Sequence, residues 1–370
     1  MKNKNILIQL SHPAHFHLYK NVAANLMKDG YKVFIVIKTK DILEDLLKES
    51  GLPYYNILKV PHRRSKLGVL MDTFVRDWRM MRFVKQNRIE LLTGSTVEVA
   101  HVGWLMRKDS INTGEDDLAV VPQFGYIAGP FVKCHLAPVS CDVGFLTKKC
   151  YKYAGYHELA YLHPNHFTPD IAIVEKYFPV DTPYFLIRFS NLKAFHDGGI
   201  KGINTEIAQK LIDILKQYGR IYITSERELE PQFESYRIKI NTLDMHHVMA
   251  FADLYIGDSQ TMAAEAGVLG VPFVRFNDFV GRIGYLNELE EVYHLGYGIR
   301  ASAQGSAWKM YEVVKEILCM SDRKEKWEVR RQKMLSEKID YAQFLTWFIE
   351  NYPESKQTMR DNPDYQFRFK

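Results

Sequence analysis

The chain has 370 residues, of which 46% are hydrophobic and 25% charged, which excludes a disordered or fibrous protein and predicts two domains. The formal net charge of +5 is modest and no nucleic-acid-binding module accompanies it, so nucleic acid is not an expected partner. The four cysteines form no CxxC pair, which favours free thiols in a reducing compartment.

No secretion signal is expected, because the first apolar run, Ile6–Leu10, is cut off by Ser11-His12-Pro13. The longest apolar stretch, 118–132, contains Pro122 and Pro130 and therefore does not fit a spanning helix. We expect a cytoplasmic protein.

The first half of the chain alternates strands and helices. Residues 5–10 predict a short strand, and Pro13 opens a helix that runs to about Lys28. The same pattern then predicts a strand at 32–37, a helix from Asp41 to about 50, a helix at about 67–86 and a strand at 89–93. Such alternation predicts a parallel sheet covered by helices on both faces.

The pattern restarts near residue 183, after a proline-rich segment at 164–182 that we expect to be the hinge. The predicted elements are strands at 184–188, 220–224, 253–257 and 272–276, with helices at about 204–218, 246–251 and 261–269. After residue 303 the chain reads as mostly helical.

The predicted fold is α/β, with two Rossmann-like parallel-sheet domains facing a cleft, at 1–165 and 183–345. A tail at 346–370 either returns to the first domain or ends loose. Open parallel sheets bind ligands at the carboxyl ends of their strands, so site residues are sought in the loops that follow strands.

The strongest feature is the segment 255–266, in which a strand ends at Gly257 and a helix begins near Thr261. Free backbone N–H groups and the helix dipole make such a start an anion site suited to a diphosphate. Glu265 lies one turn further on, where it can accept from ribose hydroxyls; the alternative is an ordinary capped helix. The residues predicted to bind the nucleotide here are Asp258, Ser259, Gln260, Thr261, Met262 and Glu265.

The loop after the first strand carries three histidines, His12, His15 and His17, but no nearby carboxylate or cysteine completes a metal-ligand set. We therefore expect no metal, and no cofactor is implied elsewhere. A histidine in such a loop can act as an acid, a base or a phosphate contact. We predict a catalytic His15, with Ser11 and His12 in binding.

Three acids, Glu115, Asp116 and Asp117, follow a short predicted strand of the first domain. Clustered carboxylates repel one another, which raises the pKa of at least one and suits proton transfer. The alternative is a solvated acidic turn.

The loop after the first strand of the second domain carries Arg188, a candidate phosphate partner, and His196 beside Asp197, a candidate proton donor. Glycines at 198, 199 and 202 suggest that this loop moves.

The segment 59–88 has nine Lys or Arg residues and two Asp residues, interleaved with apolar and aromatic side chains. Such a stretch can lie on an anionic membrane surface, which would place the protein at the inner face of the membrane. The alternative is a helix packed on its sheet with a solvated basic face.

Taken together, these motifs resemble a family. Ser11-His12-Pro13-Ala14-His15, the segments 153–162 and 188–197, and the run from Gly257 through Pro272 are similar to a prokaryotic family of predicted GT-B-fold glycosyltransferases of surface-polysaccharide clusters. The resemblance covers nearly the whole chain and implies a GT-B fold.

A more distant resemblance is to the non-hydrolysing UDP-N-acetylglucosamine 2-epimerases. It implies that Met245 and His246 lie by the base, His196 near the phosphates, and the acidic loop at the reacting sugar. This chain has Gln260-Thr261 where that group has a Gly-Gly pair, and its first loop lacks that group's Arg. These departures weigh against epimerase chemistry.

Three functions follow from these motifs. The first is a metal-independent glycosyltransferase that moves a sugar from a nucleoside diphosphate, UDP favoured, to a glycan or lipid-linked acceptor. The second is a UDP-sugar 2-epimerase, and the third is a non-catalytic sugar-nucleotide-binding subunit of a polysaccharide assembly.

Overall fold

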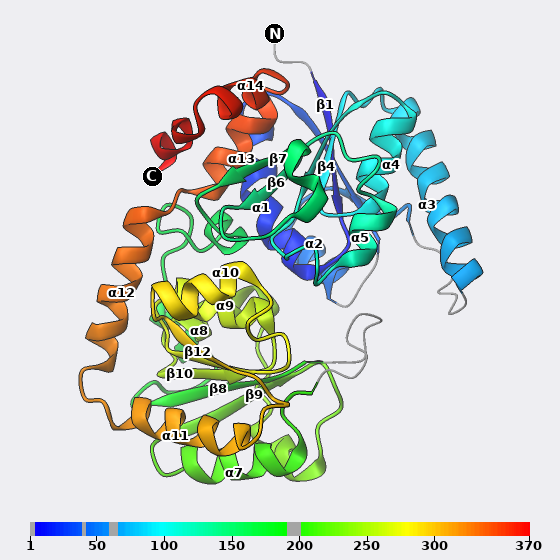
Figure 1. The fold of residues 1–370 in the computed structure, drawn as a ribbon. Helices are drawn as coiled ribbons and strands as arrows, with labels where there is room; N and C mark the ends of the chain where they lie inside the picture. Colours follow the sequence, from blue (N-terminus) through cyan, green and yellow to red (C-terminus); the bar gives the residue numbers. More distant parts are fainter. Residues whose placement is uncertain (1–3, 39–41, 59–65, 191–200) are drawn as a thin grey trace. The chain divides into compact units, whose positions relative to one another are not determined.

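The computed structural model describes residues 4–38, 42–58, 66–190 and 201–370. The chain divides into two compact units, one formed by Met1–Tyr161 with Lys338–Lys370 and the other by Leu162–Glu337 (Figure 1). His196 and the basic residues 59, 63 and 64 fall outside the described residues.

Within its described residues, the first unit contains a seven-stranded parallel sheet of order β3-β2-β1-β4-β5-β6-β7. Its central strand carries the continuous apolar run Ile6–Ile8, which is buried because helices cover both faces of the sheet. The strands are β1 (Asn5–Leu10), β2 (Lys32–Ile37), β3 (Tyr54–Tyr55), β4 (Leu91–Gly94), β5 (Asp109–Thr113), β6 (His135–Pro138) and β7 (Cys150–Tyr153).

The helices of this unit lie on both faces of its sheet (Figure 1). α3 and α4 pack over one face, through a core that includes Leu7, Phe34, Met80 and Val102, and α1 packs with α13. Their bounds are α1 (Pro13–Lys28), α2 (Leu43–Ser50), α3 (Lys66–Gln86), α4 (Val97–Leu105), α5 (Pro122–Ile127), η1 (Gly144–Lys149), η2 (His157–Ala160), α13 (Tyr341–Glu350), α14 (Glu354–Asp361) and η6 (Pro363–Phe369).

The end of the chain belongs to the first unit because its aromatic side chains pack there. Tyr341 stacks on Tyr153 with ring centroids 4.0 Å apart, and Asp340 N donates to Phe369 O. The unit boundary at Glu337 therefore precedes residue 345, where the sequence analysis placed the end of the second domain.

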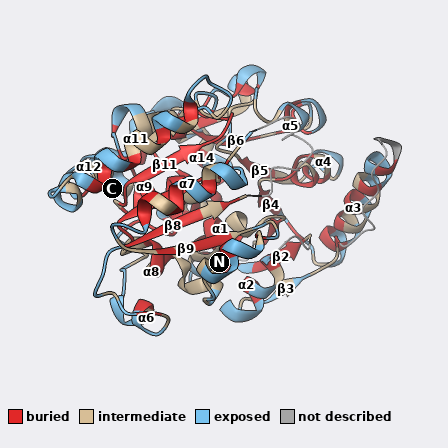
Figure 2. Ribbon diagram, turned by 90° about the horizontal axis from the view of Figure 1, so that it is seen from below, coloured by how far each residue is buried: buried red, intermediate tan, exposed pale blue. Residues whose placement is uncertain are grey.

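The second unit contains, in its described residues, a five-stranded parallel sheet of order β12-β11-β10-β8-β9. The central strands of both sheets are buried, as Figure 2 shows. The strands are β8 (Tyr184–Phe189), β9 (Arg220–Ser225), β10 (Leu254–Gly257), β11 (Phe273–Phe276) and β12 (Gly296–Ile299).

Helices also flank this second sheet, with α7 and α11 on one side and α8, α9 and α10 on the other (Figure 1). Trp327 of α12 is fully buried and donates its indole N–H to Leu295 O. The bounds are α6 (Ile171–Glu175), α7 (Thr205–Leu215), η3 (Pro231–Tyr236), η4 (Thr242–Asp244), α8 (Met245–Ala250), α9 (Gln260–Val268), α10 (Gly284–Asn287), the π-helical η5 (Glu288–Val292), α11 (Ser306–Cys319) and α12 (Arg323–Glu337).

The predicted α/β class and the two parallel sheets are confirmed. β1, α1 and β2 have the predicted bounds, whereas β4 begins at Leu91 rather than at 89. Arg88 adopts a left-handed φ of 51° and Ile89 N donates back to Val84 O, so these residues close the preceding helix instead of opening the strand. Among the described residues, no helix is both long enough and apolar enough to cross a bilayer.

Candidate functional site

Each sheet reverses its strand order once, and parallel sheets bind ligands at such reversals. In the second unit the chain runs from β8 outward to β9 and then returns to place β10 on the other side of β8. The loops after β8 and β10 therefore leave the sheet side by side, at Ser190 and at Asp258–Ser259.

The loop after β10 leads directly into α9. Ser259 is the N-cap, with extended backbone, and its Oγ accepts from Met262 N at 3.4 Å. Gln260 and Thr261 form the first turn, whose backbone N–H groups point out of the helix start. The structure therefore places four of the predicted nucleotide-binding residues at a helix N-terminus beside the strand reversal.

A buried ion pair holds the side chain of Gln260. Arg275, on the neighbouring strand β11, is fully buried and makes a two-pronged bond to Glu290, with Nε–Oε1 2.8 Å and Nη2–Oε2 3.1 Å. Its remaining Nη1 donates to Gln260 Oε1 at 2.8 Å. A Cβ at Gly298 would collide with the Glu290 carboxylate, so this glycine makes room for the pair.

This contact fixes which way the Gln260 amide faces. A guanidinium carries only donors, so the amide must present its oxygen to Arg275 and its NH₂ to the opposite side. At the first turn of α9, that NH₂ adds a donor to those of the backbone. Gln260 could be found from the sequence, whereas Arg275 and Glu290 could not, because nothing in their spacing reveals a buried pair.

Asp258 ties the two loops together instead of facing outward. Its Oδ1 accepts from Ser190 N at 2.6 Å, and its carbonyl oxygen accepts from Asn277 Nδ2 at 3.0 Å. Burial raises the pKa of this carboxyl to about 6, against which the bond from Ser190 acts. A buried carboxylate is a poor phosphate ligand, so its position fits loop anchoring better than direct nucleotide contact.

Glu265 and His246 meet in the second unit. His246 Nε2 lies 3.0 Å from Glu265 Oε1, and both side chains are buried. Glu265 stands on α9 and His246 on α8, directly after Met245. The structure thus brings together two groups that the sequence analysis placed at the ribose and the base.

Arg188 lies at the end of β8, as predicted, but its guanidinium is engaged. Its Nη2 pairs with Glu226 Oε1, which is half exposed. Phosphate binding by Arg188 would therefore require exchange of that partner. The neighbouring His196 cannot be placed, since it lies outside the described residues.

In the first unit the reversal lies between β1 and β4. His12 is the N-cap of α1 and its Nδ1 accepts from Ala14 N at 3.2 Å, while His15 Nδ1 accepts from Ser11 N at 3.3 Å. Both rings thus use Nδ1 as an acceptor, and in the neutral form the proton sits on Nε2. In this state His15 is a donor, and acting as a base requires it to give up the bond from Ser11.

A chain of hydroxyl groups lies at the carboxyl edge of the same sheet. Tyr19 OH lies 2.8 Å from Thr93 Oγ1 and 3.2 Å from Thr113 Oγ1, and Ser95 Oγ lies 2.8 Å from Thr113 Oγ1. Hydroxyls donate and accept, as sugar hydroxyls do. This group could not be found from the sequence, because its members come from α1, β4, β5 and the loop after β4.

The three acids of the 115–117 loop do not form one cluster. Glu115 Oε2 lies 3.3 Å from His157 Nδ1, whose pKa burial lowers to about 3, so the ring stays neutral at ordinary pH. Asp117 Oδ1 accepts from Asp142 N at 2.9 Å, which ties two loops together. Asp116 is the exposed member. The three carboxylates therefore do not form the mutually repelling cluster that the sequence predicted.

Among the described residues, no group of three or more His, Cys, Asp or Glu side chains is arranged to hold a metal ion.

Known proteins resemble this chain in fold and not in sequence. No protein-family model matches the chain, and no curated protein matches it significantly. The solved structures, in contrast, match along nearly the whole chain.

The S. aureus protein MnaA, in a structure with UDP, has a TM-score of 0.67 at 11% identity, covering 96% of this chain and 97% of that one. The UDP-GlcNAc 2-epimerase from Neisseria meningitidis bound to UDP-GlcNAc has a TM-score of 0.58 at 10% identity, covering 90% and 99%. The spinosyn rhamnosyltransferase SpnG with spinosyn aglycone has a TM-score of 0.62 at 12% identity, covering 93% and 99%.

The chain has the GT-B fold. Glycosyltransferases and 2-epimerases share this fold, and the expectation taken from the family resemblance is confirmed at the level of the fold. Sequence identities near 12% leave the reaction to be argued from the site.

Proposed function

We propose that this GT-B protein is a glycosyltransferase that uses a nucleoside-diphosphate sugar, UDP favoured, in the synthesis of a surface polysaccharide or glycoconjugate. The observation that carries the proposal is the start of α9, where the Arg275–Glu290 pair turns the amide of Gln260 beside the free N–H groups of a capped helix. Such a concentration of oriented donors suits a diphosphate.

The Glu265–His246 pair carries the assignment of the ribose and the base of the sugar nucleotide. We assign the Glu265 carboxylate, which His246 orients through Oε1, to a ribose hydroxyl. His246 and Met245, at the start of α8, are assigned to the nucleoside. Ser259 and Thr261 contribute hydroxyl donors to the phosphates, next to the backbone N–H groups of the first turn, while the N–H of Met262 holds the Ser259 cap in place.

Transfer breaks the bond between the anomeric carbon and the diphosphate oxygen and forms a bond from that carbon to an acceptor hydroxyl. The leaving diphosphate gains charge, which the donors at α9 stabilise without a metal ion. The acceptor hydroxyl loses its proton to a base, which we assign to Asp116 of the first unit. We assign the role to Asp116 because, of the three carboxylates of that loop, it is the one exposed to solvent.

A 2-epimerase is the second candidate, and the fold shared with the UDP-GlcNAc 2-epimerase from Neisseria meningitidis favours it. That chemistry needs one substrate and no acceptor. The third candidate, a non-catalytic sugar-nucleotide-binding subunit, would share the donor site but not depend on Asp116 or Asp117.

A thermal-shift panel of UDP, GDP, CDP, dTDP and UDP-N-acetylglucosamine tests the donor site. A ligand at a hundred times its Kd adds about 2.7 kcal/mol to stability, enough to move the melting point visibly. We expect a shift that is confined to the nucleotides of one base. A flat panel would remove the basis of the proposal.

Product analysis then separates the candidates. Incubation of the bound sugar nucleotide alone should leave it unchanged for a transferase, whereas an epimerase converts it to its 2-epimer. Adding candidate glycan or lipid-linked acceptors should release the nucleoside diphosphate. Asp116→Ala with Asp117→Ala should stop this release but keep the thermal shift, and unchanged cellular function of that variant would instead identify a non-catalytic subunit.

A further inference from the structure

The part of α3 up to Trp78 buries charged side chains and exposes apolar ones. Its buried positions carry charged side chains, Asp72, Arg76 and Asp77. Its exposed positions carry large apolar side chains, of which Leu70 is 66% exposed, Phe74 64% and Trp78 51%. An amphipathic helix on a globular domain normally shows the opposite arrangement. The exposed set consists of Val69, Leu70, Met71, Phe74 and Trp78.

Polar bonds fix this orientation. Arg76 Nε donates to Glu98 Oε1 at 2.5 Å, and Asp77 Oδ2 lies 2.8 Å from His101 Nδ1. His101 Nε2 in turn lies 2.9 Å from Ile127 O. Turning the helix to bury its apolar side would break these contacts, and breaking the buried Arg76–Glu98 ion pair is costly. The apolar side is therefore held outward.

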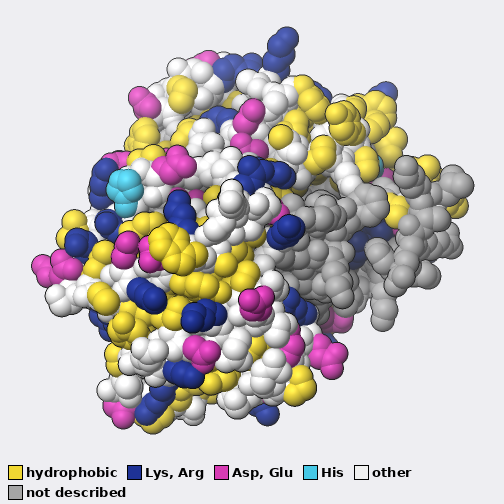
Figure 3. Space-filling view, turned by 60° about the horizontal axis from the view of Figure 1, so that its bottom comes forward, with side chains coloured by type: hydrophobic (Ala, Val, Ile, Leu, Met, Phe, Trp, Pro, Cys, Tyr) yellow, Lys and Arg dark blue, Asp and Glu magenta, His cyan; other side chains and the backbone are white. Residues whose placement is uncertain are grey.

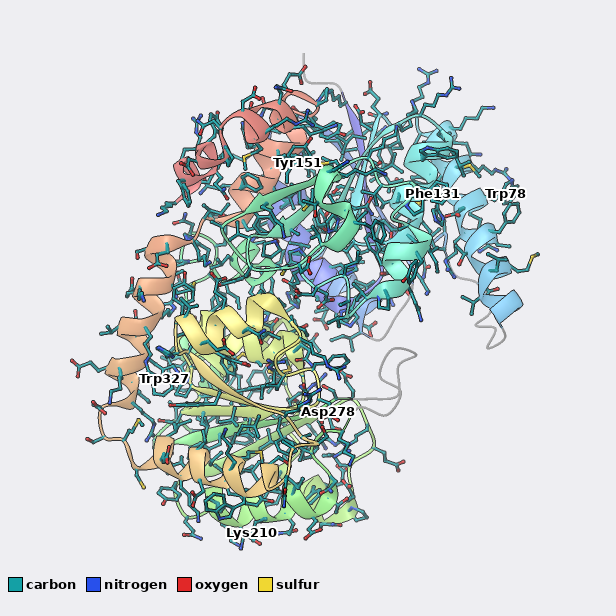
Figure 4. All side chains as sticks on the ribbon, in the orientation of Figure 1. Trp78, Phe131, Tyr151, Lys210, Asp278 and Trp327 are labelled. Atoms are coloured by element: carbon teal, nitrogen blue, oxygen red, sulfur yellow. The ribbon has the colours of Figure 1, made fainter. Side chains whose placement is uncertain are left out.

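The second half of α3 has the ordinary arrangement. Met80, Phe83 and Val84 are buried in the core of the first unit, and Arg82 and Lys85 are exposed. The exceptional feature is thus confined to the half that begins the helix. Figures 1 and 2 both show α3 at the periphery of its unit, and Figure 4 shows Trp78 on its outer side.

The exposed charges of α3 itself have one sign. Both acids of the helix, Asp72 and Asp77, are buried, whereas its bases Arg82 and Lys85 are exposed. Elsewhere, on the face drawn in Figure 3, the described Lys and Arg side chains are interspersed with Asp and Glu. The stripe therefore combines exposed aromatic side chains with positive charge.

We propose that the exposed stripe of α3 docks the protein on an anionic lipid surface. Aromatic and aliphatic side chains enter the headgroup region while the adjacent bases meet the lipid phosphates. A second copy of the chain is a poorer occupant, because a symmetric contact would bring the same positive charges together. The charge of the stripe complements an anionic membrane.

The location of the stripe agrees with this role. α3 precedes β4 and ends at its amino end, so its exposed part lies toward the carboxyl edge of the sheet, where the first turn of α1 with His15 and the loop with Asp116 also lie. If the proposed function holds, docking there would bring a lipid-linked acceptor toward that edge. The docking itself does not depend on any reaction.

Sedimentation with vesicles tests the proposal on the full-length protein. The wild type should bind vesicles of mixed phosphatidylglycerol and phosphatidylcholine, and not vesicles of phosphatidylcholine alone. Raising the salt from about 0.1 M to about 1 M, which shortens the Debye length from about 10 Å to about 3 Å, should weaken binding. Phe74→Ala with Trp78→Ala should weaken it roughly tenfold or more, since both side chains are exposed and their loss leaves the core intact.

Trp308→Ala is the matched control, because Trp308 is 65% exposed on α11 of the other unit and should not affect binding. Arg82→Gln with Lys85→Gln should lower the preference for anionic vesicles. Equal binding to both vesicle types, or undiminished binding of the Phe74→Ala/Trp78→Ala variant, overturns the proposal. So does a wild-type dimer in sedimentation equilibrium that this variant dissociates, because the stripe would then be a protein interface. None of these readouts uses the sugar-nucleotide site.

Discussion

Replacing Gln260 by Glu exchanges one amide NH₂ for an oxygen at the start of α9. Arg275 Nη1 donates to Gln260 Oε1 at 2.8 Å, and a carboxylate accepts that bond equally well. The fold should therefore tolerate Gln260→Glu, and the melting temperature of the unliganded protein should be unchanged or higher. What changes is the side turned toward the diphosphate, where a donor becomes a negative charge.

The size of the effect follows from two contributions. A hydrogen bond to a charged group is worth about 1.5–3 kcal/mol, which the variant loses. Like unit charges about 4 Å apart near a protein surface repel by about 4 kcal/mol before screening by salt. Since about 1.4 kcal/mol is a factor of ten, the Kd for the nucleoside diphosphate should rise at least a hundredfold.

Isothermal titration with the nucleotide chosen by the thermal-shift panel measures this change. Gln217→Glu is the matched control, because Gln217 is exposed after α7 at the amino edge of the same sheet and carries the same exchange. Its affinity should equal that of the wild type. Wild-type affinity in Gln260→Glu, with the fold intact, would refute the assignment of Gln260 to the diphosphate.

Three further predictions concern the buried polar groups. Arg275→Met should lower the free energy of unfolding in urea by about 3–5 kcal/mol, because it leaves Glu290 buried without its partner. Adding Glu290→Leu should recover part of this loss, whereas losses that simply add would contradict a coupled pair. Glu265→Gln should weaken UDP binding roughly tenfold but leave pyrophosphate binding unchanged, whereas an equal loss for both would remove Glu265 from the ribose. Burial lowers the pKa of His135 to about 4 and of His157 to about 3, so below pH 6.5 the unfolded chain takes up protons that the folded one does not. The free energy of unfolding should thus be about 2 kcal/mol lower per histidine at pH 5 than at about pH 7.5. Urea unfolding of the wild type, His135→Gln and His157→Gln at these two pH values measures the difference. If both variants lost as much stability as the wild type between the two pH values, the prediction would be contradicted.

Much of the fold could be predicted from the sequence because local signals agreed with the tertiary structure. Pro13 begins α1 at the predicted residue, and the apolar runs of β1 and β2 gave their bounds. β6, β7 and β12 were not predicted. Each has only four residues, and polar or glycine positions such as His135 and Gly298 interrupt its apolar pattern.

The candidate site was found in part, for a physical reason. Loops after strands mark where ligands bind, so Ser259 and Gln260 could be chosen from sequence. The partners that orient them could not, because the Arg275–Glu290 pair depends on burial. On α3 the sequence shows both a charged and an apolar stripe, and periodicity alone predicts the apolar one inward. Only the contacts of Arg76 and Asp77 reveal the reverse.

The most direct test of the central claim is a crystal structure of the protein grown with the nucleoside diphosphate that gives the thermal shift. The account predicts the diphosphate at the first turn of α9, within hydrogen-bonding distance of the Gln260 amide NH₂ and the neighbouring backbone N–H groups, with a ribose hydroxyl on Glu265. A diphosphate bound elsewhere, with the start of α9 in contact with solvent alone, would contradict it.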